Sequence, residues 1–390
     1  MRIIGETSIP FLSYRWIALA VSGTLILAGL GLIFFGPGLN KGIDFVGGTQ
    51  VTVKFQEEPD LDRLRESLNA LAVGTPVIQQ FDEIEKHEIL IRVQNPEDES
   101  GDYTGSILGL LHSEFDPALS GRFDLNTSGA QGLMEILMDS DPDGIGADFD
   151  DRQVAYLSMA EAVSGFRKEH GIFSSIDELD QIEALSEPVR AHLKETCGAG
   201  FFSLLGAESV GPAVGADLRK KATLAIVFSL VGMLIYIWVR FQLPYGLGAV
   251  AALFHDVLIT LGALTLTQRE INLPTIAALL TLVGYSVNDS VVVFDRVREN
   301  LRIRRDVALQ PLMDLSINQV LSRTLITSGT TMVVVLSLYL FGGDVINTFA
   351  FVLLVGIVVG TYSSVFVAAP VALGVTRRLE AWKKKRAMRR

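Results

Sequence analysis

Six long apolar stretches dominate the pattern of hydrophobic and polar positions in this chain. They cover residues 16–36, 220–240, 245–267, 273–295, 317–341 and 345–375. Each stretch is long enough to cross about 30 Å of hydrocarbon as an α-helix. Five of them follow one another through the last part of the chain, which is not typical of core helices in a soluble domain. The pattern therefore predicts a polytopic α-helical membrane protein with six transmembrane helices.

Between the first two stretches, the pattern is that of a soluble domain. Apolar residues alternate with polar ones at Val51, Val53 and Phe55, as in a half-buried β-strand. The other elements expected here are helices at 61–71 and 106–115 and strands at 87–93 and 201–209. Strands separated by short helices predict a small α+β domain of ferredoxin-like type, formed by residues 37–117 and 201–219.

Residues 118–200 interrupt this domain with a segment of mostly helical character. Helix N-caps are expected at Asn126 or Thr127, and again at Ser174 or Ser175, where acidic residues follow in the first turn. A surface loop tolerates such an insertion. The segment is therefore predicted to be an inserted helical module.

Composition agrees with a membrane protein. Hydrophobic residues make up 49% of the 390 residues, and the mean hydropathy is +0.38. The single cysteine, Cys197, rules out an intramolecular disulfide. The first apolar stretch lacks a short apolar core followed by a small-residue cleavage site, so we expect a retained span and not a cleaved signal peptide.

The formal net charge of −11 hides a strong asymmetry in the placement of positive residues. They gather before the first span, after the second, between the fourth and fifth, and after the sixth, for example at Arg15, Arg240, Arg302 and Arg378. By the positive-inside rule, residues 1–15, the basic loop 296–316 and the basic tail 376–390 are expected to be cytoplasmic. The α+β domain is then extracytoplasmic, in a multi-pass membrane protein with both termini in the cytoplasm.

Polar residues inside the spans are the candidate chemistry. An ionised carboxylate in hydrocarbon costs at least about 3 kcal/mol, so Asp289 in the fourth span should face protein or water. The third span contributes Asp256, and the fifth contributes Arg323 at a depth similar to that of Asp289. The supporting polar residues predicted around them are Asn288, Tyr285, His255 and Thr327.

A membrane carboxylate that is neutralised in turn by a proton and by an arginine can act as a switch. We therefore predict that Asp289, Arg323 and Asp256 couple proton passage to helix movement. The alternative is a permanent ion pair that only fixes helix packing. Neither reading includes a catalytic residue, and the chain is not expected to be an enzyme.

The sequence resembles the SecF protein-export membrane proteins of the SecD/SecF family. The resemblance is carried by Gly42–Thr49, Val210–Gly215, His255–Asp256, Gly284–Arg296 and Arg323–Ser328. These five motifs occur in order and cover the chain except for the insertion. The family belongs to the resistance-nodulation-division superfamily, so the resemblance implies half of that superfamily's transmembrane bundle.

The resemblance also implies a function. Family members pair with SecD, dock on the SecYEG channel and use proton-motive force to promote translocation of unfolded polypeptides across the inner membrane. Carried over, the roles of the membrane carboxylate and of the arginine fall on Asp289 and Arg323. Two alternatives remain: half of a small-molecule efflux transporter, which predicts a substrate cavity and two large external loops, and a membrane scaffold without a proton role.

The insertion departs from the family pattern. Its segments 124–127, 144–146 and 173–179 resemble the helix-hairpin-helix modules of ComEA and of type II secretion K-like minor pseudopilins. Such hairpins can contact DNA phosphates, but this one is acidic, so nucleic acid is not an expected partner. A protein contact or a spacer role is favoured.

The same insertion allows a metal hypothesis. Asp139, Asp141, Asp143 and Asp150 have the spacing of a twelve-residue calcium loop around Gly144. Gly146 replaces the usual apolar residue, and Asp150 replaces a bidentate glutamate, which weakens the match. The alternative is an acidic turn between helices, and no other cofactor is expected.

Overall fold

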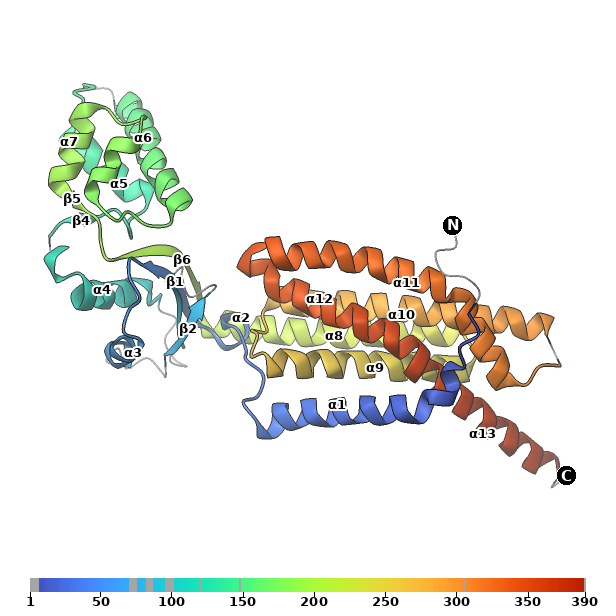
Figure 1. The fold of residues 1–390 in the computed structure, drawn as a ribbon. Helices are drawn as coiled ribbons and strands as arrows, with labels where there is room; N and C mark the ends of the chain where they lie inside the picture. Colours follow the sequence, from blue (N-terminus) through green and yellow to red (C-terminus); the bar gives the residue numbers. More distant parts are fainter. Residues whose placement is uncertain are drawn as a thin grey trace. The chain divides into compact units, whose positions relative to one another are not determined.

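The computed structural model describes residues 7–69, 76–81, 87–94, 102–119, 121–146, 149–304 and 306–388. The chain divides into two compact units. The bundle unit comprises Met1–Gly42 and Leu218–Arg390, and the strand-bearing unit comprises Ile43–Asp217 (Figure 1).

Long helices make up the bundle unit. They are α1 (Arg15–Phe35), α8 (Pro212–Arg240), α9 (Leu243–Leu266), α10 (Leu273–Ile303), α11 (Leu309–Phe341), α12 (Gly343–Ser363) and α13 (Ala369–Ala387), with a 3₁₀ turn η1 (Phe11–Tyr14) before α1 and a π-helix η5 (Ser364–Ala368) between α12 and α13. Within the described residues, six helical stretches are long and apolar enough to cross a membrane. The prediction of six transmembrane helices is therefore confirmed.

The helix ends differ from the predicted ones on the basic side. The predicted loop 296–316 is largely helical, because α10 continues to Ile303 and α11 begins at Leu309. The predicted tail is helical as well, since α13 continues to Ala387. Arginine and lysine favour helices and no glycine or proline interrupts α10 there, so nothing stops it where its apolar pattern ends.

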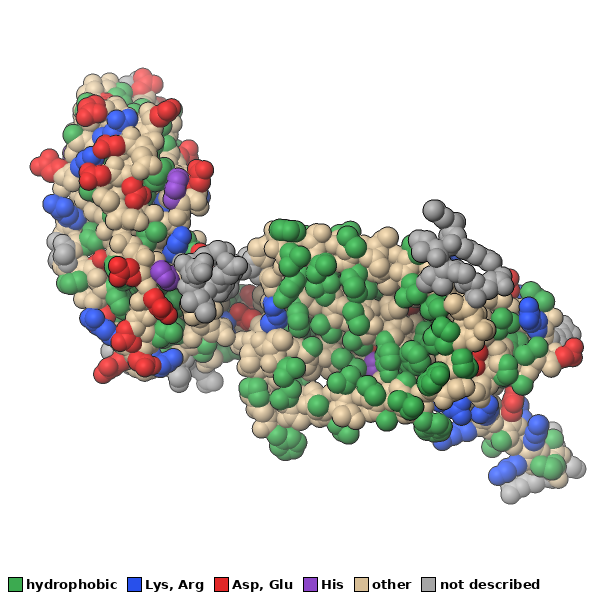
Figure 2. Space-filling model, in the orientation of Figure 1, with side chains coloured by type: hydrophobic (Ala, Val, Ile, Leu, Met, Phe, Trp, Pro, Cys, Tyr) green, Lys and Arg blue, Asp and Glu red, His purple; other side chains and the backbone are tan. Residues whose placement is uncertain are grey.

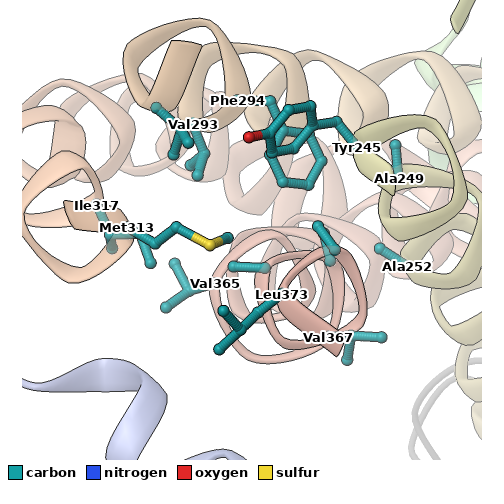
Figure 3. Packing of buried hydrophobic residues seen from close by; sticks show 14 of the residues in the cluster. Tyr245, Ala249, Ala252, Val293, Phe294, Met313, Ile317, Val365, Val367 and Leu373 are labelled. Atoms are coloured by element: carbon teal, nitrogen blue, oxygen red, sulfur yellow. The ribbon is translucent and has the colours of Figure 1, made fainter. Parts of the chain in front are cut away.

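The core of the bundle lies where α9, α10, α11 and the η5–α13 segment meet (Figure 3). The ring of Phe294 lies 5.2 Å from that of Tyr245, centroid to centroid. On α9, Ala249 and Ala252 are buried and small, which lets neighbouring backbones approach closely. Small and large side chains therefore alternate across this interface.

Helices α1 and α9 cross at two glycines. A Cβ atom added to Gly29 would lie 3.0 Å from the Cα of Gly262. This contact is available only to residues without side chains, so the pair fixes α1 directly against α9.

The surfaces of the two units differ in character. Figure 2 shows hydrophobic side chains spread over the visible face of the bundle, whereas acidic and basic side chains are scattered over the strand-bearing unit. Bundle residues such as Trp16, Phe228 and Val333 are at least 65% exposed. Large exposed apolar side chains of this kind suit contact with lipid or with other helices.

The strand-bearing unit contains a four-stranded antiparallel sheet in the order β2-β3-β1-β6. Its elements are β1 (Gly48–Phe55), α3 (Leu61–Asn69), β2 (Val77–Phe81), β3 (Glu88–Val93), α4 (Thr104–Phe115) and β6 (Phe202–Val210), with a short helix α2 (Ile43–Val46) before β1. This βαββαβ order is the ferredoxin-like arrangement, which confirms the predicted α+β fold. Strand β2 was not predicted.

The predicted alternation in β1 is borne out by burial. Val51 and Val53 are fully buried and Phe55 is 1% exposed, with α3 and α4 contributing Leu64 and Ile107 to the same core. Every second residue of β1 therefore faces α3 and α4, because successive side chains of a strand point to opposite faces of the sheet.

The inserted segment lies between α4 and β6 and is helical. It contains a 3₁₀ turn η3 (Pro117–Leu119), α5 (Ala130–Ser140), α6 (Phe149–His170), a 3₁₀ helix η4 (Ile176–Gln181) and α7 (Glu187–Thr196). Two short parallel strands, β4 (Phe123–Asp124) and β5 (Cys197–Gly198), pair where the segment leaves and rejoins the sheet. Its own core includes Tyr156, Phe173 and Cys197, all fully buried.

The cap predictions for this segment have mixed outcomes. Asn126 and Thr127 do not cap α5, because the helix begins later, with Gly129 at its N-cap. Asn126 is instead fully buried, and its amide hydrogen-bonds to the backbone of Phe173 and Gly200 at 2.8–2.9 Å. Ser175 does act as an N-cap, although the element that follows it is the 3₁₀ helix η4.

Candidate functional site

Among the bundle residues whose burial the structure describes, two carboxylates are buried, each in its own polar cluster. The first is Asp256 on α9, which is fully buried. It lies 2.8 Å from Nδ1 of His255 and accepts hydrogen bonds from the hydroxyls of Ser363 (2.8 Å) and Ser286. Three neighbours from α9, α10 and α12 therefore satisfy both oxygens of this carboxylate.

His255 extends the first cluster to α1. Its Nε2 lies 2.9 Å from the hydroxyl of Ser22. Ser22 is 3.2 Å from the Tyr362 hydroxyl, which donates to the carbonyl of Ala18 (2.9 Å). The imidazole thus bridges two helices, and we name the set Ser22, His255, Asp256, Ser286, Tyr362 and Ser363 the Asp256 cluster.

The second carboxylate, Asp289 on α10, is 2% exposed and less well satisfied. Its Oδ2 atom accepts from the hydroxyls of Ser328 and Thr361, both at 3.5 Å. The single proton of the Thr361 hydroxyl is shared with the Ser328 oxygen, which lies closer, at 2.8 Å. Asp289, Ser328 and Thr361 form the Asp289 cluster, in which, among the residues that the structure describes, hydrogen bonds reach one carboxylate oxygen and both are long.

Helix α12 touches both clusters through three consecutive residues. Thr361 contacts Asp289, whereas Tyr362 and Ser363 belong to the Asp256 cluster. The π-helix η5 begins immediately afterwards, at Ser364. Successive residues of an α-helix point about 100° apart, so these three side chains reach different neighbouring helices.

The predicted site residues fall into separate groups. His255 and Asp256 come together, but Arg323 does not join Asp289: its side chain is exposed, and in the described part of the chain the two form no ion pair. Asn288 and Thr327 are exposed as well. The expected contact between the carboxylate and the arginine is therefore absent from this conformation of the chain.

Tyr285 is partly buried one turn before Asp289. Its hydroxyl oxygen has no accessible surface and no hydrogen-bond partner among the described residues. The side chain was predicted as a supporting polar residue, and the structure gives it no contact with Asp289.

Sequence reasoning missed the hydroxyl residues of both clusters. These are Ser22, Ser286, Ser328, Thr361, Tyr362 and Ser363. Serine and threonine are common in membrane helices, where their hydroxyls also bond to the preceding turn, so their presence alone marks no site. The one available signal was the density of polar residues at 361–364 within an apolar span.

The structure does not gather the predicted calcium ligands Asp139, Asp141, Asp143 and Asp150 into a metal site. Asp141 ends α5 in a left-handed conformation (φ 41°) and accepts from the Tyr156 hydroxyl (2.7 Å) and the Ile145 N–H (3.0 Å). Across the described residues, no group of three or more His, Cys, Asp or Glu side chains is placed to hold a metal ion. The calcium hypothesis and its alternative, an acidic turn between helices, therefore stay predictions.

The contact between Asp141 and Tyr156 perturbs both groups. Burial, followed by the hydrogen bond to Asp141, raises the pKa of Tyr156 to about 12. The Tyr156 hydroxyl is in turn the main cause of a lowered pKa of Asp141. Asp141 therefore stays ionised and holds the turn in place.

Two family models match the chain. Residues 32–58 match the SecD/SecF GG motif, and residues 192–378 match the C-terminal part of the protein export membrane proteins SecD/SecF. A protein translocase subunit SecF from Koribacter versatilis is 41% identical to this chain, over 95% of the chain and 92% of its own length. The chain belongs to the SecF family.

Other SecF relatives support this membership. The protein translocase subunit SecF of Calditerrivibrio nitroreducens is 36% identical over 94% of each chain, and that of Vibrio alginolyticus is 34% identical over 94% of this chain and 90% of its own. The predicted resemblance is confirmed. Residues 59–191 lie outside both family models, so the likeness of the insertion to helix-hairpin-helix modules stays a prediction.

Solved structures of SecDF share the fold. That of SecDF from Thermus thermophilus, a translocon-associated membrane protein, is 28% identical with a TM-score of 0.64, over 95% of this chain. A second SecDF structure, in a super-membrane-facing form, matches with a TM-score of 0.56 over 98% of this chain. This chain spans only 39% and 41% of those two chains. The neighbours agree with a polytopic helical membrane protein that carries an extracytoplasmic domain.

Proposed function

We propose that this SecF-family chain uses proton-motive force to promote translocation of unfolded polypeptides across the bacterial inner membrane. Its relatives are named protein translocase subunits, and a structural neighbour is named as associated with the translocon. These names favour export over small-molecule efflux, which was the alternative reading of the same bundle.

The observation that supports a proton role is the poor solvation of Asp289. A buried carboxylate needs several close hydrogen-bond donors or a cation to stay ionised. Asp289 has two hydroxyl donors, each at 3.5 Å, and no ion pair within the described residues. These surroundings suit the neutral, protonated carboxyl, which is the state that a proton carrier must reach.

The ionised state of Asp289 requires a further partner, and Arg323 is the proposed one. Its exposed guanidinium lies on α11, the helix that also supplies Ser328 to the Asp289 cluster. Rotation or sliding of α11 against α10 would replace hydroxyl contacts of Asp289 with the cation. Proton binding and release would then alternate with this movement. In this scheme Asp256 keeps its present partners and anchors α1, α9, α10 and α12.

Exposed polar residues at membrane depth indicate a partner. Asn288, Arg323 and Thr327 are all exposed on the bundle, although an arginine in contact with lipid is costly. A second set of membrane helices can cover them, and SecD is the proposed source because the longer SecDF chains contain more than this chain spans. The SecYEG channel and the emerging polypeptide are the other proposed partners.

The proposed orientation places both termini in the cytoplasm. The turn η1 and the end of α13 lie at the same end of the bundle (Figure 1). The basic residues Arg377, Lys384 and Arg386 belong to α13 at that end. The positive-inside rule assigns this end to the cytoplasm and hence the strand-bearing unit to the other side.

The test is Asp289→Asn, measured by export into inner-membrane vesicles with and without a proton gradient. We expect stimulation by the gradient to disappear while ATP-driven export without a gradient is unchanged, because asparagine cannot carry the proton. Asp295→Asn is the matched control, since Asp295 lies on the same helix and pairs with Arg240 at 3.0 Å near its exposed end. Full stimulation in Asp289→Asn would leave only the scaffold reading.

The partner proposal is tested by purification after gentle solubilisation of the membrane. We expect a SecD-type protein and channel subunits to accompany the chain. Arg323→Leu should weaken that association if the arginine faces the partner helices. Arg15→Leu is the control and should not weaken it, because Arg15 is not one of the exposed polar residues that the partner helices are proposed to cover. Recovery of the chain alone under these conditions would contradict the proposed assembly.

A further inference from the structure

The short connection between α9 and α10 is hydrogen-bonded to the segment that leaves α1. We call residues 267–272 the α9–α10 turn and residues 38–42 the exit segment. The Ile271 N–H donates to the Asn40 carbonyl and the Gly42 N–H donates to the Ile271 carbonyl, both at 2.8 Å. Lys41 and Ile271 thereby form a parallel β-bridge. Gly42 is the last residue of the bundle unit, and the chain continues directly into the strand-bearing unit.

Side chains reinforce this bridge from both sides. The Asn40 amide donates to the Gln268 carbonyl at 2.9 Å, and the Gln268 amide donates to the Gly38 carbonyl at 3.4 Å. Gln268 adopts a left-handed conformation (φ 50°), which glycine or asparagine would adopt at lower cost. The contact is therefore a built feature of the turn and not a chance approach of two loops.

Gly42 lies in close contact with the α9–α10 turn at the bridge. A Cβ atom at this position would lie 2.6 Å from Oε1 of Glu270 and 3.1 Å from the carbonyl oxygen of Ile271. The Glu270 side chain can move aside, but the Ile271 carbonyl belongs to the backbone, so a branched residue at position 42 would press the exit segment and the turn apart. The bridge can thus be loosened by a single substitution.

Arg269 connects the same turn to two other helices. Its guanidinium donates to the side chains of Asn347 on α12 (2.5 Å) and Tyr339 on α11 (3.1 Å). It also lies over the ring of Phe351, 4.5 Å from the centroid. The turn is therefore clamped to the ends of α11 and α12 that lie opposite the chain termini.

The turn also starts α10, the helix that carries Asp289. Asn272 is the N-cap of α10, and its side chain accepts from the Thr275 N–H at 3.0 Å. Thr275 donates its hydroxyl to the Glu270 carbonyl at 3.0 Å. The exit segment is thereby tied to the first turn of α10, about 24 Å along the helix from Asp289.

We propose that the α9–α10 turn is a permanent strap that transmits movement of α10, α11 and α12 to the exit segment, and so to the strand-bearing unit. Arg269 and Gly42 are its positioning residues: Arg269 gathers the helix ends, and Gly42 keeps the exit segment on the bridge. The inference rests on the proposed function, because it explains how a proton step at Asp289 reaches the extracytoplasmic domain.

The first experiment uses Gly42→Val in the full chain with its partner subunits, in inner-membrane vesicles. We expect proton passage dependent on Asp289 to continue, whereas stimulation of export by the gradient is lost, because the bridge is forced apart. Gly31→Val is the matched control, since a Cβ at Gly31 on α1 meets nothing within 4 Å. Gly42→Val with full stimulation would overturn the proposal, and so would loss of proton passage, which would indicate general damage.

Arg269 provides a second variant that leaves the bridge itself intact. Arg269→Gln should reduce stimulation of export while proton passage continues, because α11 and α12 are released from the turn. Arg269→Lys should restore part of it, since a lysine can still donate to Asn347. Equal and full stimulation in both variants would exclude Arg269 from the strap.

A double variant tests whether the strap stays closed. Lys41→Cys with Ile271→Cys allows a disulfide across the bridge, and the chain's own Cys197 is buried and will not compete. A permanent strap predicts that oxidation leaves stimulated export unchanged. Arrest on oxidation, reversed by reduction, would show that the bridge opens in each cycle and would overturn the proposal.

Asp289→Asn, measured in the same assay, distinguishes a failure of the proposed proton function from a failure of the proposed strap. If it keeps the stimulation, the proposed proton function is wrong. If it loses the stimulation but Gly42→Val keeps it, the proton function stands and only the strap is wrong.

Discussion

Asp256 and Asp289 are both buried in the same bundle, yet their surroundings are opposite in kind. A histidine and two serine hydroxyls surround the two oxygens of Asp256, and His255 Nδ1 and the Ser363 hydroxyl each lie 2.8 Å from the carboxylate. Asp289 has two hydroxyls at 3.5 Å on one oxygen. Similar burial therefore gives two different environments, because the number and closeness of donors decide which protonation state a buried carboxylate favours.

The difference also concerns helix packing. The Asp256 cluster joins α1, α9, α10 and α12, and it lies beside the glycine crossing of α1 and α9. The Asp289 cluster joins α10 to α11 and α12 through weaker contacts. One side of the bundle is thus fixed, and the other has few polar contacts to break when helices move.

The largest expected effect is a difference in the free energy of unfolding between alanine variants of the two carboxylates. Asp256→Ala should lower the free energy of unfolding by about 3 kcal/mol, because His255 and two serines lose their acceptor. Asp289→Ala should lower it by less than about 1 kcal/mol, because its contacts are long. Unfolding of each purified variant in detergent, followed by circular dichroism, measures both values. Equal losses would erase the distinction between the clusters.

The next effect concerns the packing that supports the Asp256 cluster. Gly29→Val should lower the free energy of unfolding by about 2 kcal/mol, because the new side chain enters the space of Gly262. Gly23→Val on the same helix is the control, since a Cβ there meets nothing within 4 Å. The same unfolding assay applies, and a silent Gly29→Val would show that α1 is free to shift.

Single hydroxyls should give a smaller difference. Ser363→Ala removes a donor at 2.8 Å from Asp256 and should lower the free energy of unfolding by about 1 kcal/mol. Ser328→Ala removes a donor at 3.5 Å from Asp289 and should cost less than half of that. Thermal unfolding of the two variants side by side makes the comparison, and the reverse order would contradict it.

The smallest effect on stability should come with a change in function. Thr361→Val keeps the shape of the side chain and should lower the free energy of unfolding by only about 0.5 kcal/mol. Because Thr361 is one of two donors to Asp289, stimulation of export by the gradient should fall, whereas Ser363→Ala should leave it unchanged. Vesicle export with and without a gradient checks this, and equal stimulation in both would mean that Thr361 does not serve Asp289.

Much of the fold follows from local pattern. The six spans and the alternation in β1 were predicted because hydrophobic periodicity reports directly which segments enter lipid or face a core. Strand β2 was missed because it is a short edge strand whose pairing with β3 is set by a partner strand and not by its own pattern. The loop predicted at 296–316 was too long, because the end of an apolar stretch marks the membrane boundary and not the end of the helix.

The site was predicted only in part. Asp289 and Asp256 stand out because carboxylates are rare in spans. Ser22 and Thr361 do not, since their partners are 233 and 72 residues away along the chain. Arg269 was not predicted as a site residue, because its contacts with α11 and α12 depend on how three helix ends meet.

The sequence by itself determined that this chain crosses the membrane six times, has strands and short helices between the first two spans and places acids within its spans, because each of these depends on residues close together in the chain. Only the tertiary structure decided that Asp256 is well satisfied, that Asp289 is not, and that Arg323 faces outward. Lipid and helix surfaces are equally apolar, so a hydrophobic pattern cannot tell which side of a span meets a neighbour. That choice is made by packing.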